Sequence, residues 1–161
     1  MNTLTNKTAA GTSEELMSTV DVLMRAFRAH THGRCLPAPG VLSFSPLARR
    51  IEIEPDGRDD LARQLANLLL WAHTLTDVTA AWTRLDSGRF HVAVTGRTTI
   101  GARVRVYCLG LFTDCVGLVA LDPGQTDGVS LDELYALACL LRENQQNGGM
   151  VAREGAGKGV A

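Results

Sequence analysis

The feature that most constrains the fold is a run of strand-like segments between Thr76 and Leu121. After the Asp86-Ser87-Gly88 turn, the stretch from Phe90 to Val94 places an apolar residue at every second position, which is the period of a half-buried strand. Gly88 can adopt the positive φ that a three-residue hairpin loop requires. The pattern therefore predicts a β-hairpin at the centre of the fold.

Two more segments extend this hairpin into a sheet. A turn from Gly96 to Gly101 leads into an alternating segment, with Ala102, Val104, Val106 and Cys108 on one face and Arg103, Arg105 and Tyr107 on the other. Val116 to Leu121 is apolar on both faces, which predicts an inner strand. Arg50 to Glu54 alternates charged residues with isoleucine and predicts a short edge strand blunted by its charges. We expect an antiparallel meander of about four to five strands.

Helices are predicted before and after this sheet region along the chain. Two capping boxes mark the starts of apolar stripes at helical spacing, and they predict helices from residue 12 to about 29 and from residue 130 to about 143. The boxes pair Thr12 with Glu15 and Ser130 with Glu133. A third helix, capped by Asp56, is expected over residues 56 to 75.

The helix predicted over residues 56 to 75 has an unusually wide apolar surface. Its inner stripe consists of Leu61, Leu65, Leu68, Leu69, Ala72 and Leu75. Leu70 and Trp71 widen that stripe beyond what one sheet face needs, so we expect either the first helix or a partner subunit to cover them. Leu70 and Trp71 are thus candidate interface residues of a homodimer.

Length and composition place the chain among ordinary globular proteins. The 161 residues are 45% hydrophobic and 20% charged, which fits one α+β domain over residues 12 to 144 with three helices mainly on one sheet face. Residues 1 to 11 are predicted to be a disordered arm and residues 145 to 161 a mobile tail. With no apolar run near the roughly 20 residues of a membrane span and no signal-like start, we expect a cytoplasmic protein without membrane contact.

An arginine-rich sheet face is the candidate binding surface for anions. By alternation, six side chains near the two central strands should gather there: Arg89, His91, Arg97, Arg103, Arg105 and Tyr107. Such a surface could bind phosphate or single-stranded nucleic acid. The alternative is a solvated outer face, which antiparallel sheets often have. The net charge of −1 adds no long-range attraction for nucleic acid.

Two further groups of residues could carry chemistry. His30, His32 and Cys35 are ligand types that zinc accepts, although their spacing matches no regular zinc pattern, and a helix end with favourably placed histidines is the alternative. Cys108 or Cys115 could act as a nucleophile with His91 as its base, but Cys108 falls on the apolar face, where an inert thiol is expected. We expect four free thiols and no cofactor.

The sequence therefore indicates a fold more firmly than a function. Within the sequence we find no phosphate-binding loop, dinucleotide fingerprint, nucleophile elbow or paired-histidine zinc motif. The leading hypothesis is a non-catalytic binding or regulatory module that acts through contacts with an unknown protein partner or with itself as a homodimer. A nucleic-acid or phosphate-binding protein is the second hypothesis, and a small enzyme is the third.

Overall fold

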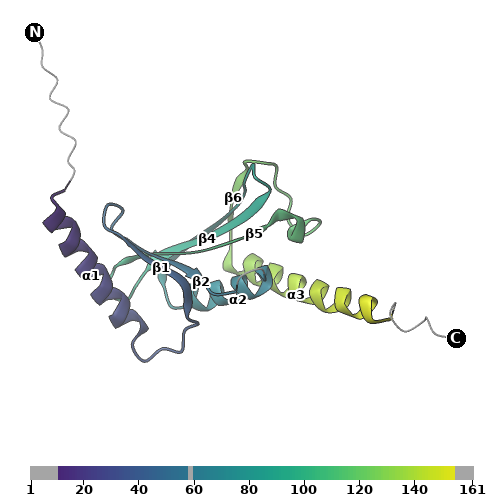
Figure 1. Ribbon diagram of the computed structural model, residues 1–161, viewed down its shortest axis with the longest axis horizontal. Coiled ribbons are helices and arrows are strands. Elements are labelled where there is room, and N and C mark those ends of the chain that lie inside the picture. The colour runs from purple at the N-terminus through teal and green to yellow at the C-terminus, as the bar shows by residue number, and fades with distance from the viewer. Residues whose placement is uncertain (1–10, 58–59, 155–161) are drawn as a thin grey trace, which may run out of the picture.

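The computed structural model describes residues 11–57 and 60–154 and confirms the predicted α+β class. Over these residues it has three α-helices and one mixed sheet of six strands (Figure 1). The helices are α1 (Ser13–Thr31), α2 (Leu61–Ala72) and α3 (Leu131–Glu154). The strands are β1 (Pro39–Ser45), β2 (Arg50–Pro55), β3 (Thr76–Arg84), β4 (Arg89–Arg97), β5 (Arg103–Leu111) and β6 (Thr126–Val129). Within the described ranges, no helix combines the length and apolarity that crossing a membrane requires.

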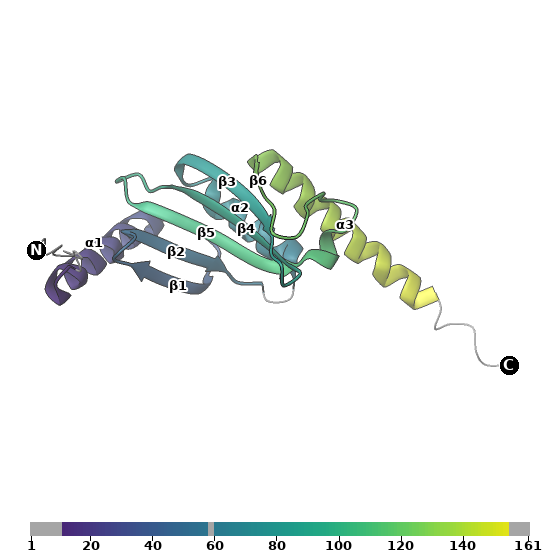
Figure 2. The same ribbon diagram turned by 90° about the horizontal axis from the view of Figure 1, so that it is seen from above.

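The sheet has the strand order β1-β2-β5-β4-β3-β6, which Figure 2 shows from above. The predicted hairpins β3–β4 and β4–β5 form its centre, and every neighbouring pair is antiparallel except β2–β5. The strand predicted over Arg50 to Glu54 is β2, but it is not an edge strand, because β1 covers its free side. The parallel pairing of β2 with β5 joins the first hairpin to the rest of the sheet.

The segment from Val116 to Leu121 is not a strand, contrary to the sequence prediction. After β5, the chain forms a short 3-10 helix, η1 (Phe112–Cys115), and Gly117 then adopts a φ of +81° that no regular strand uses. This segment has no strand hydrogen bonds to the sheet, and it is fastened by Arg84, whose Nη1 donates to the carbonyl oxygen of Leu121 at 3.0 Å. The sixth strand is β6, which pairs with β3 in a stretch where the sequence indicates only a turn.

Helix α2 packs on the inner face of the sheet and forms the centre of the core. Leu65 and Leu68 are fully buried, as are Ile51 and Val106 on the facing strands. The helix also approaches the sheet closely at two glycines. A Cβ at Gly110 would lie 3.0 Å from the Leu61 side chain, and one at Gly96 would lie 2.9 Å from the Cβ of Leu75, just past the helix end. Both glycines therefore allow α2 to lie this close to the sheet.

The first turn of α2 begins later than predicted. Asp60, not Asp56, is the N-cap, and its carboxylate accepts a hydrogen bond from the backbone N–H of Arg63 at 3.1 Å. Asp56 instead belongs to the preceding loop, where its carbonyl oxygen accepts from the Asn67 side chain at 2.8 Å. The loop is thus fastened to the helix that follows it.

Of the two residues that widen the apolar face of α2, Trp71 is covered by helix α1. The Trp71 ring is only 2% exposed and stacks on Phe27 with a centroid separation of 6.1 Å. Thr12 caps α1 through the predicted box, with Glu15 accepting from the Thr12 N–H at 2.9 Å. Trp71 is therefore a core residue and not an interface residue, whereas Leu70 remains 52% exposed.

Helix α3 lies beside α2 on the same side of the sheet and then extends past it (Figure 1). The capping box of Ser130 and Glu133 is confirmed, with the backbone N–H of Glu133 donating to Ser130 Oγ at 3.2 Å. The predicted end near Glu143 is wrong. Gln145 donates to the capping carboxylate of Asp60 at 3.2 Å, so the first polar turn of the extension contacts the start of α2. Residues 1–10 and 155–161 of the predicted arm and tail lie outside the described residues.

We predict that Leu65→Ala lowers the free energy of unfolding by about 2–5 kcal/mol, because it removes a fully buried side chain between α2 and the sheet. Leu47→Ala is the control, since Leu47 is 80% exposed and its loss should change stability by no more than about 0.5 kcal/mol. Urea unfolding followed by circular dichroism measures both. Equal effects of the two substitutions would show that α2 does not anchor the core.

Candidate functional site

The register of β4 and β5 places the predicted arginine-rich set on one face of the sheet. Arg97 lies opposite Arg103, and His91 lies opposite Leu109, so the exposed positions of both strands alternate onto the outer face. All three helices pack on the other side (Figure 1). The set therefore shares a solvent-facing surface, the outer sheet face, as alternation predicts.

The outer sheet face also carries carboxylates that the sequence analysis did not place there. Because β2 lies beside β5, Glu52 contacts Arg105 at 3.7 Å and also pairs with Arg50 on its own strand. Burial together with the charges of Glu54 and Glu52 raises the pKa of the Tyr107 hydroxyl. An edge strand at this position would lie away from the arginines, but the pairing of β2 with β5 brings Glu52 and Glu54 onto their face. These two carboxylates divide the cationic surface.

Arg105 is occupied by its neighbours at the middle of this face. Its Nη2 lies 3.4 Å from His91 Nε2, and its guanidinium lies 5.3 Å from the centre of the Tyr107 ring. Burial, and then the charge of Arg105, lower the pKa of His91, so this imidazole is neutral at pH 7. Arg105, His91 and Tyr107 thus form a packed cluster that is already engaged with itself and with Glu52.

Three other arginines gather at one end of the sheet. Arg50 at the start of β2, Arg97 at the end of β4 and Arg103 at the start of β5 line a pocket of about 550 Å³, together with Asp77 from β3. Arg97 Nη1 donates to the carbonyl oxygen of Gly101 at 3.1 Å, and its Nε lies 3.9 Å from Asp77. We call this the arginine pocket. Arg89 is at the opposite end of β4 and does not reach it.

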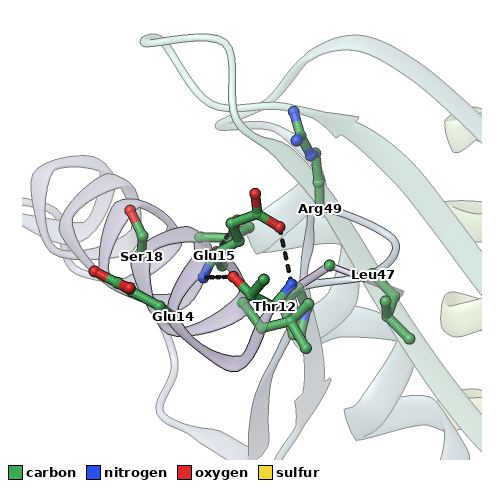
Figure 3. A pocket seen from close by; sticks show the side chains of 10 residues that line it. Thr12, Glu14, Glu15, Ser18, Leu47 and Arg49 are labelled. Atoms are coloured by element: carbon green, nitrogen blue, oxygen red, sulfur yellow. Dashed lines mark hydrogen bonds between the residues drawn. The ribbon is translucent and has the colours of Figure 1, made fainter. Parts of the chain in front are cut away.

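Another hollow lies where α1 begins beside the β1–β2 turn (Figure 3). It has a volume of about 750 Å³, and Thr12, Glu15, Leu47 and Arg49 are among the residues that line it. The two hydrogen bonds drawn there join Thr12 and Glu15 and are the capping box of α1. Thr12 and Glu15 are therefore already engaged in capping the helix.

The predicted zinc ligands are not brought together. His30 is buried, and its Nε2 lies 2.8 Å from Thr74 Oγ1 while Arg34 Nη1 lies 3.1 Å from Nδ1. Burial and the charge of Arg34 lower the pKa of His30. Cys35 is exposed in the loop after α1, and no group of three possible ligands, including His32, assembles within the described ranges. His30 therefore joins α1 to the end of α2.

An apolar groove between α2 and α3 is the site that the sequence analysis half anticipated. It has a volume of about 260 Å³, and its residues recur at helical spacing on both helices: Ala66, Leu69, Leu70 and His73 on α2, and Tyr135, Ala138, Cys139 and Arg142 on α3. Leu70 is 52% and Tyr135 is 63% exposed. We call it the α2–α3 groove. Tyr135 and Ala138 belong to the apolar stripe from which this helix is predicted, but the sequence does not show that Ala138 is buried while Tyr135 stays exposed.

The chain matches no protein-family model, no curated protein and no solved structure.

All four cysteines are free thiols, and we predict that they divide into two reactive and two inert ones. Burial raises the pKa of Cys108, and burial together with Asp114 raises the pKa of Cys115 to about 12, so both remain protonated at pH 8. Cys35 is exposed and Cys139 is partly exposed. A chromogenic disulfide reagent should titrate two thiols in the dilute native protein and four in urea. Rapid native reaction at Cys115 would contradict this assignment and reopen it as a nucleophile.

Proposed function

We propose that this protein is a non-catalytic binding module that acts through protein–protein contacts and that it forms a homodimer through the α2–α3 groove. The exposure of Leu70 and Tyr135 in one continuous groove carries the proposal. Tyrosine is enriched at protein interfaces because it offers a large apolar surface with a polar tip. A groove walled by two helices is also a common receptor for a third helix.

The polar rim of the groove favours a second copy of the same chain. On α3, Asp132 is exposed in the first turn, and Arg142 is exposed at the far side of the groove. Within the described part of the chain, neither side chain forms an ion pair. If two α3 helices pack antiparallel about a twofold axis that crosses them at the height of residue 137, each Arg142 lies near Asp132 of the other copy. In this arrangement the charges of one α3 helix complement those of the second copy.

The same antiparallel arrangement also matches the apolar part of the groove. The midpoint of Asp132 and Arg142 along α3 places Cys139 of one copy opposite Tyr135 of the other. Both residues line the groove, and Tyr135 would lose its exposed surface on pairing. Leu70 on the α2 wall would be covered at the same time. Burying these side chains supplies the hydrophobic part of the association.

The chemistry of the buried thiols supports a binding role over a catalytic one. Cys108 is fully buried and Cys115 has a pKa of about 12, so neither supplies a thiolate near pH 7. His91, the candidate base, already contacts Arg105. An active site needs a nucleophile, a base and an orienting group in one accessible place, and these residues do not provide it.

We predict that Leu70→Glu converts a homodimer into a folded monomer. A charge at this position costs little in the monomer, because the side chain is 52% exposed, but it would be buried and unpaired in the dimer. Light scattering should give about twice the chain mass of 17.3 kDa for the wild type and the chain mass itself for the variant. Far-UV circular dichroism should be the same for both.

The matched control is Met17→Glu on α1. Met17 is 60% exposed on a helix and does not line the groove, so this variant should remain dimeric. A wild-type protein that is monomeric at every accessible concentration would contradict the homodimer. A Leu70→Glu variant that keeps the wild-type mass would place the dimer interface elsewhere.

A further inference from the structure

We infer that the arginine pocket binds the phosphate group of a small molecule. This site is on the opposite side of the sheet from the α2–α3 groove and does not depend on the proposed homodimer. It uses Arg97 and Arg103 from the predicted anion-binding set and adds Arg50, which the sequence analysis assigned to an edge strand. Its volume of about 550 Å³ is in the range of small-ligand sites.

The charges that line the arginine pocket leave it positive. Three guanidiniums face one carboxylate, that of Asp77, and the pairing of Glu52 with Arg50 reduces the excess to one positive charge. Among the described residues, Arg103 has neither an ion pair nor a hydrogen bond to its guanidinium. Its fork of N–H donors is therefore available for an oxyanion, which arginine binds in a bidentate manner.

Arg50 provides a second available donor at the same place. Its Nε is buried and has no acceptor among the described residues, although its Nη2 is paired with Glu52. A buried donor without a partner costs free energy, which an acceptor oxygen would recover. Arg50 lines the pocket, so a rotation of its side chain toward a bound oxyanion would give this Nε an acceptor.

The backbone around the pocket is also unusual. Asp77 has a φ of +52° and lies where the β3–β4 register shifts, between Thr76 and Thr79. Arg49, which precedes Arg50, has a φ of +49°. Positive φ is uncommon outside glycine, although aspartate tolerates it better than arginine, and such conformations cluster at ligand sites. Asp77 lines the pocket from β3, and Arg49 lies in the β1–β2 turn between two lining residues, Ala48 and Arg50.

The ligand should be a small phosphate compound and not a nucleic acid. A polynucleotide needs a cationic track along which several phosphates bind in succession. On the outer sheet face, Glu52 interrupts that track beside Arg105, Glu54 lies beside Tyr107, and Asp77 interrupts the track beside Arg97. The arginines that lie close together without an interrupting carboxylate on each are thus those of the pocket, whereas Arg89 stands alone at the other end of β4.

The test uses the full chain and pyrophosphate as the probe. Pyrophosphate should raise the melting temperature in a saturable manner, because a ligand that binds only the folded state stabilises it by mass action. Sodium chloride at the same ionic strength serves as the control for nonspecific salt effects. Arg103→Gln should weaken the apparent affinity by roughly tenfold or more, as expected for the loss of charged hydrogen bonds.

Arg89→Gln is the matched control, because Arg89 lies on the same sheet face at the other end of β4. It should bind pyrophosphate with the wild-type affinity. A temperature shift that is absent, equal in sodium chloride, or unchanged in Arg103→Gln overturns the proposal. A single-stranded oligonucleotide that binds more tightly than pyrophosphate, and more weakly to Arg89→Gln, overturns it in favour of a polyanion surface along the whole face.

Discussion

The close packing of α2 on the inner face of the sheet is the contact on which the rest of the structure depends. Leu61 lies over Gly110 and Leu75 lies over Gly96, so both ends of this element approach the sheet backbone where no side chain intervenes. Between these ends, Leu65 and Leu68 are fully buried. Because α1 and α3 flank α2, through Trp71 and through the α2–α3 groove, the position of α2 determines where both other helices can pack.

This packing leaves two surfaces with different chemistry. On the helix side, α1 covers Trp71 but leaves Leu70 exposed, and α3 supplies the second wall of an apolar groove. On the sheet side, pairing of β2 with β5 brings Glu52 against Arg105 and neutralises the middle of the face, while Arg50, Arg97 and Arg103 remain together at one end. An apolar groove fits a protein partner, and a confined cationic pocket fits a small anion.

The sequence predicted those features that depend on neighbours along the chain. The hairpins of β3, β4 and β5 and both capping boxes follow from alternation and from local spacing, and all of them are present. The errors arise where partners are distant in sequence. No local pattern could show that β1 and β5 enclose β2, because a strand of alternating charges reads equally well as an edge strand.

The candidate sites follow the same division between local and distant information. The shared face of Arg103 and Arg105 was predictable from period two, but the contact of Glu52 with Arg105 required the parallel register. The wide face of α2 correctly indicated a covering element, yet the sequence could not assign Trp71 to α1 and leave Leu70 exposed. Similarly, the polar composition after Glu143 did not reveal the contact of Gln145 with Asp60 that accompanies the longer α3.

The most direct test of self-association through the α2–α3 groove is the rate of thiol labelling as a function of protein concentration. Cys139 lines the groove, and Cys35, exposed in the loop after α1, is an internal reference in the same molecule. We predict that labelling of Cys139 slows as the concentration rises through the dimer dissociation constant, while labelling of Cys35 keeps the same rate. A Cys139 rate that stays constant from the lowest to the highest accessible concentration would contradict it.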